Sequence, residues 1–218
     1  MPDYNPPSDT GLELIHQDAA LLVLNKPSGL LSVPGRGADK QDSLLTRARN
    51  RFADAECVHR LDMETSGLML LARGKQAQRA LNRLFQQRRI DKQYVAVVDG
   101  KVEPRVGEIQ LPLRCDWPNR PRQKVDFAQG KASLTRFSVL SHDADHYTSR
   151  VALQPKTGRS HQLRVHMQSL GHSILGDRLY ASPETRRRAP RLLLHANALA
   201  FCHPLTGRQS HFYSHAPF

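Results

Sequence analysis

Short apolar runs and helical stripes alternate along the chain, and together they predict its elements. The runs at 12–16 and 21–25 predict a strand hairpin that ends in the Pro- and Gly-containing turn at 26–29. The segment 75–88 predicts an amphipathic helix, because apolar residues recur there at helical spacing: Ala77, Ala80, Leu81, Leu84 and Phe85. The same criteria predict helices at 43–51 and 160–170, strands at 68–72, 93–98, 134–140 and 150–154, and a final hairpin of 199–201 with 211–213.

The predicted strands outnumber the helices, and short hairpin links join several of them. This pattern favours the α+β class, with a mixed, largely antiparallel sheet and a few packed helices. No repeat or Gly/Ser-rich linker divides the sequence, so we expect a single domain over residues 1–218. The Pro-rich start predicts a short extended arm at about residues 1–10.

Composition points to a polyanionic partner. The chain of 218 residues holds 32 Lys and Arg against 20 Asp and Glu, a formal net charge of +12. Of the 32 basic residues 24 are Arg, whose planar guanidinium suits bidentate contacts with phosphates and base edges. Nucleic acid is therefore the favoured partner.

No apolar run approaches the length of a membrane span, and the first residues do not resemble a secretory signal, so we expect a cytoplasmic protein without membrane attachment.

Several cofactor and metal sites lack their signatures. The segment from Gly67 to Lys75 has the wrong spacing for a phosphate-binding P-loop, and no Gly-x-Gly-x-x-Gly is present for a dinucleotide. His161 and His166 are five residues apart, whereas a helical zinc pair needs four. The later histidines and the three scattered cysteines match no common metal site or disulfide framework. We therefore expect neither a metal nor a cofactor.

Two segments concentrate groups that could perform chemistry. Residues 58–67 (VHRLDMETSG) place Asp62 two residues after Arg60 in a stretch closed by Thr, Ser and Gly. On composition alone this segment is a turn, and Asp62 is structural. Residues 156–166 (KTGRSHQLRVH) gather polar and basic groups that could equally form a solvated helix face.

Taken together, the two segments resemble the motifs of the RluA family of pseudouridine synthases, in which His-Arg-Leu-Asp-x-x-Thr-Ser-Gly contains the catalytic aspartate. The resemblance extends to 92–96 (KQYVA), 158–166 and 172–180 (HSILGDRLY), in the family's order along nearly the whole chain. It implies the pseudouridine synthase catalytic fold. The chain is similar to the family's compact members, which modify 23S ribosomal RNA and the anticodon stem-loop of tRNA, and we expect no S4 domain.

The resemblance assigns the catalytic residues. Asp62 is the expected nucleophile or base, Arg164 the cation beside it, and Tyr94 the ring that stacks on the uracil and helps remove its C5 proton. Breaking the N1–C1′ bond and rejoining through C5 involves no net redox change, so the reaction demands no cofactor. A uridine in folded RNA must leave the stack to reach a side chain, so base flipping is expected.

RNA contacts are expected from three basic regions. Arg60 could fill the gap left by the flipped base, although its alternative is an ion pair with a nearby carboxylate. The stretch 117–124 offers Trp117, Arg120, Arg122 and Lys124 to an RNA loop, and 186–188 offers Arg186, Arg187 and Arg188 to phosphates. Either stretch could instead be merely solvated. No obligate protein partner is implied.

Two other functions fit parts of the sequence. An RNA N-glycosidase would use Asp62 and Glu64 as paired carboxylates and release uracil by hydrolysis. A non-catalytic RNA-binding module would need the basic charge but not Asp62. Product analysis separates the first from an isomerase, and a substitution of Asp62 separates the second.

Overall fold

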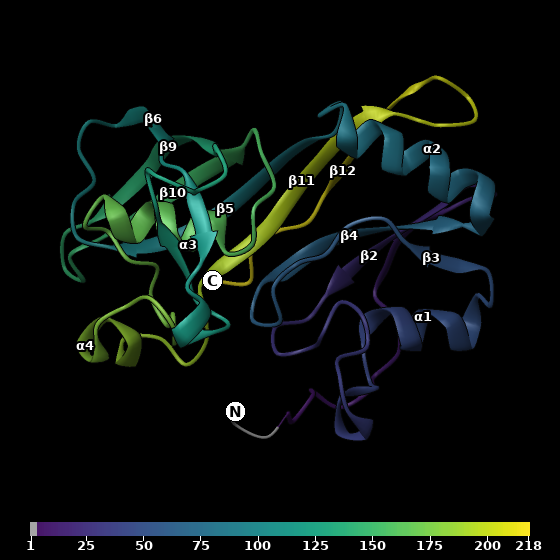
Figure 1. The fold of residues 1–218 in the computed structure, drawn as a ribbon, viewed down its shortest axis with the longest axis horizontal. Helices are drawn as coiled ribbons and strands as arrows, with labels where there is room; N and C mark the ends of the chain where they lie inside the picture. The colour runs from purple at the N-terminus through teal and green to yellow at the C-terminus, as the bar shows by residue number, and fades with distance from the viewer. Residues whose placement is uncertain (1–3) are drawn as a thin grey trace. The chain divides into compact units, whose positions relative to one another are not determined.

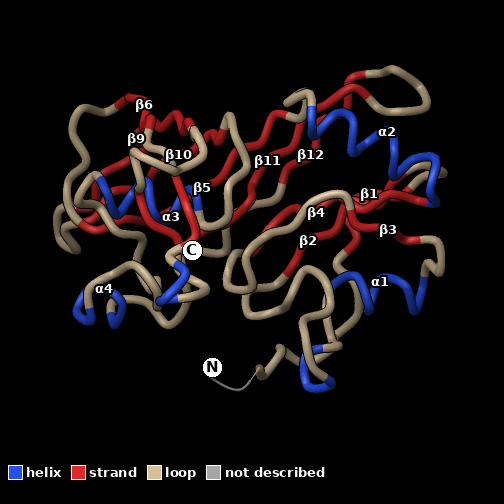
Figure 2. Tube along the Cα trace, viewed as in Figure 1, coloured by secondary structure: helices blue, strands red, loops and turns tan. Residues whose placement is uncertain are grey.

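The computed structural model describes residues 4–218, which divide into two units (Figure 1). Unit 1 comprises the chain up to Lys92 together with His195–Pro217, and unit 2 comprises Gln93–Leu194 with Phe218. Each unit combines a mostly antiparallel sheet with a few helices, which confirms the predicted α+β class (Figure 2). The single domain over residues 1–218 stays a prediction.

In unit 1 the sheet order is β1-β2-β4-β11, with β3 also paired to β4 and β12 to β11. The pairing of β4 with β11 is parallel, whereas β1–β2, β2–β4, β3–β4 and β11–β12 are antiparallel. Both predicted hairpins, β1–β2 and β11–β12, are confirmed. The strand bounds are β1 Leu14–Gln17, β2 Leu21–Lys26, β3 Ala55–Cys57, β4 Ser66–Arg73, β11 Leu194–Cys202 and β12 Gln209–Tyr213.

Helix α2 (Gly74–Gln86) packs on β4 in unit 1 through its predicted apolar stripe. Ala77 and Leu81 are buried, in a cluster that includes Leu70 of β4 and Phe201 of β11. Helix α1 (Leu44–Arg51) begins after Ser43, whose Oγ accepts a hydrogen bond from the Thr46 N–H at 3.1 Å, as an N-cap should. A 3-10 turn, η1 (Ala38–Lys40), precedes it.

The predicted N-terminal arm falls partly outside the described residues, which exclude 1–3. Residues 4–10 form neither helix nor strand and lie along the segment 31–47. The Tyr4 hydroxyl donates to the Asp42 carbonyl at 3.0 Å and accepts from the Leu31 N–H at 3.0 Å. These bonds hold the start of the described chain against residues 31–47 of the same unit.

Unit 2 contains a four-strand antiparallel order, β5-β10-β9-β6, and a separate β7–β8 hairpin. Helix α3 (Gln162–Ser169) places Leu163 and Met167 in a core cluster with Val151 and Leu153 of β10. The other bounds are β5 Asp91–Asp99, β6 Val106–Gln110, β7 Leu113–Cys115, η2 Trp117–Asn119, β8 Gln123–Val125, β9 Leu134–Asp143, β10 Thr148–Pro155 and α4 Pro183–Arg187.

The structure departs from the predicted elements mainly at short segments. The sequence pattern did not predict β3, β6, β7, β8 and α4, each of three to five residues. The helix predicted at 75–88 ends at Gln86, because Arg88 adopts a left-handed conformation with φ 56°. In residues 4–218 no helix is both long and apolar enough to cross a membrane.

Candidate active site

Asp62 lies in unit 1, on the connection from β3 to β4. The segment turns tightly here, because the Thr65 N–H donates to the Asp62 carbonyl at 3.1 Å. Gly67 follows at φ 110°, where a Cβ would stand 2.3 Å from the Ala196 carbonyl oxygen of β11. Only glycine permits this close parallel pairing of β4 with β11. The Thr-Ser-Gly end of the motif thus fixes where the Asp62 turn joins the sheet.

A second loop, residues 26–32, holds the backbone on both sides of Asp62. Lys26 is 1% exposed, and its ammonium donates to the carbonyls of Pro27, Leu30 and Met63 at 2.8, 2.7 and 2.9 Å. The Gly29 N–H also donates to the Met63 carbonyl at 2.9 Å. A buried ammonium is tolerated only when its donors are satisfied, and here three carbonyls satisfy them. The residue next to Asp62 is therefore anchored twice.

Two serines of the same loop complete the anchoring. The Ser32 hydroxyl donates to the Leu61 carbonyl at 2.7 Å and accepts from the Leu61 N–H at 3.0 Å. The Ser28 hydroxyl donates to the Glu64 carbonyl at 2.7 Å. Residues 61, 63 and 64 are thus all fixed from one side, so the Asp62 side chain projects from a rigid turn.

His59 ties the start of this turn to the sheet and to α2. Its Nε2 accepts a hydrogen bond from the Leu70 N–H at 2.8 Å, and its ring stacks on Phe85 at 4.8 Å between centroids. Burial, assisted by the positive charge of Lys92, lowers the pKa of His59 to about 3. His59 is therefore a neutral acceptor at physiological pH and plays a structural part in the motif.

Arg164 lies on α3 in unit 2 and is 4% exposed. Its guanidinium forms a bidentate ion pair with Asp177, in which Nε donates to Oδ2 and Nη2 donates to Oδ1, both at 2.7 Å. Asp177, 1% exposed, also accepts the N–H groups of Leu179 and Tyr180 at 2.8 and 3.1 Å. This fork geometry fixes the plane of the guanidinium as well as its position.

Tyr180 covers Arg164 and links three elements of unit 2. Its ring centroid lies 5.1 Å from the Arg164 Cζ, within cation–π range. Its hydroxyl accepts from the Gln123 N–H at 2.7 Å and lies 2.6 Å from His161 Nδ1. Tyr180 thereby connects Arg164 on α3 with strand β8.

Tyr94 lies on β5 of unit 2, in register with Leu153 of β10. It is partly buried and packs against the core cluster that contains Val98 and Val151. Packing of this kind is also what an ordinary core aromatic of a strand would show. Because Tyr94 is not fully buried, part of its side chain remains accessible for the predicted contact with a base.

Comparisons with known proteins identify the family. A model of the family described as RNA pseudouridylate synthase matches residues 20–169. The dual-specificity RNA pseudouridine synthase RluA of Escherichia coli is 54% identical over 218 residues, which cover 100% of this chain and 99% of that protein. The chain belongs to the RNA pseudouridylate synthase family. The RluA protein of Haemophilus influenzae is 49% identical over 216 residues, 99% of this chain and 98% of its own.

The solved structures agree with this assignment. Human RNA pseudouridylate synthase domain containing 1 is 32% identical and covers 98% of this chain and 87% of its own, with a TM-score of 0.81. The pseudouridine synthase fold expected from the sequence is therefore confirmed. The chain is a pseudouridine synthase, an isomerase.

In this synthase the three predicted catalytic residues are divided between the units. Asp62 belongs to unit 1, whereas Tyr94 and Arg164 belong to unit 2. Within unit 2 the ion pair of Arg164 is with Asp177. A direct pairing of Arg164 with Asp62 stays a prediction.

The stretch 117–124 of the synthase carries four of its predicted RNA-binding residues. Trp117 is 67% exposed, and the Arg120 guanidinium lies 4.0 Å from its ring centroid. Arg122 lies 5.6 Å from the Tyr180 ring centroid, and Lys124 is exposed on β8. The stretch therefore presents an exposed aromatic side chain together with three cations.

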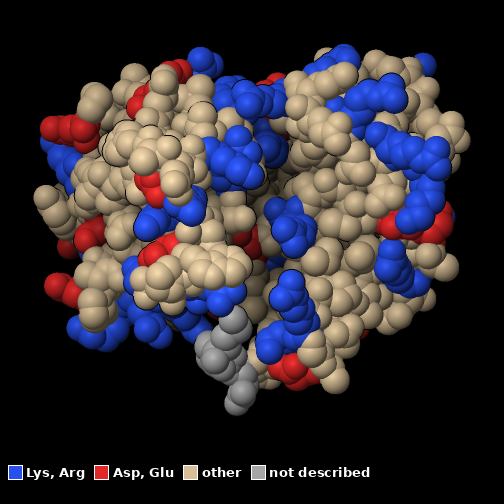
Figure 3. Space-filling model, in the orientation of Figure 1, with Lys and Arg blue, Asp and Glu red and all other residues tan. Residues whose placement is uncertain are grey.

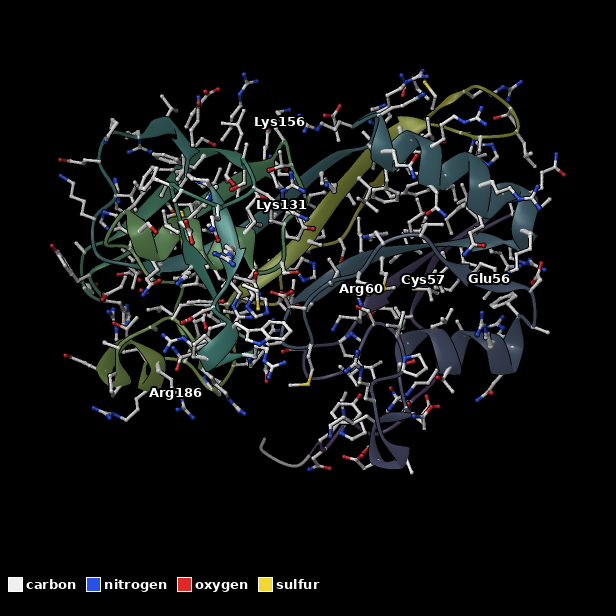
Figure 4. The ribbon with its side chains drawn as sticks, viewed as in Figure 1. Glu56, Cys57, Arg60, Lys131, Lys156 and Arg186 are labelled. Carbon is white, nitrogen blue, oxygen red and sulfur yellow. The ribbon has the colours of Figure 1, made fainter. Side chains whose placement is uncertain are left out.

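The remaining predicted RNA-binding residues differ in their surroundings. Arg60 is exposed on the connection after Cys57, and Arg186 is exposed on α4 (Figure 4). Arg187 of the same helix is exposed as well. Basic side chains gather over α4 in the space-filling view (Figure 3). Arg188, in contrast, forms an ion pair with Asp99 and donates to the His146 carbonyl. Arg188 is thus partly neutralised within unit 2.

Sequence reasoning missed Lys26, Asp177 and Tyr180 as supporting residues. The position of Lys26 directly after the apolar strand 21–25 could have indicated a supporting role for this cation. The predicted turn at 26–29, however, accounted for a lysine at this position equally well. Asp177 and Tyr180 lie in a segment that only the family resemblance singled out. In the described part of the chain no three His, Cys, Asp or Glu side chains gather into a metal site.

Proposed function

We propose that this pseudouridine synthase modifies a uridine in 23S ribosomal RNA and one in the anticodon stem-loop of tRNA. The proposal is supported by identity of 54% over the full length to a relative named as a dual-specificity enzyme. The net charge of +12 and the exposed basic side chains of 117–124 and 186–187 suit an RNA substrate.

Asp62 is the proposed catalytic carboxylate. The observation on which this rests is the rigid turn around it, since the backbone of residues 61, 63 and 64 is hydrogen-bonded to a single neighbouring loop. Preorganisation of this kind lets a carboxylate meet a reacting sugar or base without rearrangement. As nucleophile or base, Asp62 promotes cleavage of the N1–C1′ bond. The uracil then turns and rejoins through C5, whose proton is lost while N1 gains one.

Arg164 and Tyr94 are proposed to serve the same reaction. Arg164 is a buried cation held in one plane by Asp177, and a fixed cation favours the ionised form of a nearby carboxylate. Tyr94, which is only partly buried, would stack on the flipped uracil, and its hydroxyl would help to remove the C5 proton.

The basic residues are proposed to bind the RNA around the flipped nucleotide. Arg60 would occupy the space that the base leaves, because a guanidinium both stacks and donates hydrogen bonds. Trp117 with Arg120 offers a stacking platform for an unpaired base. Arg122, Lys124 and Arg186–Arg188 would contact phosphates, with Arg188 the weakest contributor because Asp99 already pairs with it.

Mapping of pseudouridine tests the proposal directly. Ribosomal RNA and tRNA from cells with and without the gene should differ at one 23S position and one anticodon stem-loop position. Loss at neither position would contradict the dual specificity, and release of free uracil by the purified protein would favour the N-glycosidase. The absence of a cofactor and the cytoplasmic location remain predictions from the sequence.

A further inference from the structure

Helix α2 and the turn after it expose a cationic surface that the proposed chemistry does not use. Residues 74–90 contain five basic residues and no Asp or Glu. Four of them, the α2 arginine surface, are exposed: Arg79, Arg83, Arg88 and Arg89. Basic side chains cover α2 in the space-filling view (Figure 3).

These four arginines lack the acidic partners that neighbouring cations have. At the start of α2, Arg73 and Lys75 pair with Asp54 and Glu56 at 2.8 and 2.6 Å. Among residues 4–218 no ion pair or side-chain hydrogen bond engages any guanidinium of the α2 arginine surface. Arg79 and Arg83 are one helical turn apart, where like charges repel. A bound polyanion would relieve this repulsion.

The backbone conformation of Arg88 is a second feature of this surface, separate from its lack of acidic partners. At the C-terminal end of α2 the Arg89 N–H donates to the Leu84 carbonyl at 2.9 Å, and the Arg88 N–H donates to the Phe85 carbonyl at 3.1 Å. In helix ends with this pair of hydrogen bonds, the position that Arg88 occupies is usually a glycine. Arg88 instead adopts φ 56°, which is strained for a residue with a Cβ. The chain therefore keeps a cation where glycine would fit better.

The surface is rigidly joined to the Asp62 segment within unit 1. The Gln78 side chain of α2 donates to the Cys57 carbonyl at 3.0 Å, and Phe85 of α2 stacks on His59. Both contacted residues lie within five positions of Asp62. A polyanion held on α2 is thereby held in a fixed relation to the catalytic turn.

We propose that the α2 arginine surface binds backbone phosphates of the substrate RNA outside the target nucleotide. This inference rests on the proposed function for the identity of the polyanion. The only aromatic residue of 74–90, Phe85, is engaged with His59, so this surface offers no aromatic platform for a base and presents its guanidinium groups to phosphates. Its contribution is consequently independent of base sequence and depends on salt.

The test compares two variants that each remove two positive charges. Arg79→Gln/Arg83→Gln alters the surface, whereas Lys101→Gln/Arg136→Gln removes exposed cations that are paired with Glu103 and Glu108. Binding of a fluorescently labelled tRNA anticodon stem-loop is titrated at several salt concentrations. The surface variant should bind about tenfold more weakly at low salt, and the slope of log Kd against log salt should fall by about 2, roughly one for each lost contact. The control should keep the wild-type slope.

Arg88→Gly gives a second readout that a purely structural role would not produce. Glycine suits the left-handed position, so the thermal midpoint should not fall, yet RNA binding should weaken. Wild-type slopes for Arg79→Gln/Arg83→Gln, or wild-type RNA binding by Arg88→Gly, would overturn the inference. Neither result bears on isomerisation, whereas failure of the wild-type protein to form pseudouridine would defeat only the proposed function.

Discussion

Replacement of Lys26 by Met should damage both stability and catalysis, although Lys26 has no proposed contact with the substrate. Met preserves the length of the apolar stem and removes the ammonium. Three carbonyls, those of Pro27, Leu30 and Met63, then each lose one hydrogen-bond donor. Each hydrogen bond from a charged donor contributes about 1.5–3 kcal/mol. Removing the buried ammonium regains several kcal/mol of desolvation.

The balance of these opposing effects is a net loss of about 3 kcal/mol in the free energy of unfolding. For a chain of this size, that loss lowers the thermal midpoint by about 6–12 °C. Catalysis should fall further than stability explains, because the Met63 carbonyl adjoins Asp62 and loses one of its two donors. A displacement of about 1 Å at a catalytic group lowers the rate about 100-fold.

The assay measures turnover well below the midpoint, with RNA affinity and thermal unfolding followed in parallel. Lys40→Met is the matched control, since Lys40 lies in the same unit and its ion pair with Asp39 is at the surface. The control should change none of the three quantities appreciably. Wild-type turnover and midpoint in Lys26→Met would refute the anchoring role assigned to Lys26.

Three further predictions concern the ring residues and the absence of a cofactor. Tyr94→Phe should bind RNA but fail in the later steps, while Tyr94→Leu should also bind weakly; full activity of the Leu variant in a turnover assay would remove Tyr94 from the site. The pKa of His59 lies near 3 in the folded protein against 6.5 ordinarily, so its contribution to stability is complete above pH 6.5 and is lost as the pH falls toward 3. Between about pH 7 and about pH 5 the free energy of unfolding, measured by denaturant titration, should therefore fall less in His59→Gln than in wild type, by up to about 2 kcal/mol. An equal fall in both proteins would contradict the assignment of His59 as a neutral hydrogen-bond acceptor. Exhaustively chelated enzyme should retain its rate on RNA with a verified fold, and activity restored only by added metal would contradict this.

The strongly periodic elements were predictable from sequence because local patterns determine them. The apolar stripe of α2 and the hairpin of β1 and β2 are such elements. The end of α2 was not predictable, since Arg88 adopts a conformation that its residue type disfavours. Nor was the parallel pairing of β4 with β11, because it joins residues about 130 positions apart and depends on Gly67 allowing a close approach.

The candidate site divides in the same way. Asp62, Tyr94 and Arg164 were singled out because family motifs contain them, whereas composition alone favoured a structural role for Asp62. The residues that orient them were missed, because their roles exist only in three dimensions. Lys26 acts through carbonyls of a distant turn, and Asp177 acts through the guanidinium of Arg164. Such long-range polar contacts leave no periodic signal in the sequence.

The central claim is that Asp62 is the catalytic carboxylate and contributes little to RNA affinity, which other residues supply. Asp62→Asn preserves the shape of the side chain and removes its charge. Release of tritium from RNA labelled at uracil C5, measured beside a binding titration, reports catalysis and affinity separately. The variant should release no tritium above background and bind RNA within a few-fold of wild type. Near-wild-type release from Asp62→Asn would contradict the account and leave Asp62 as a turn residue.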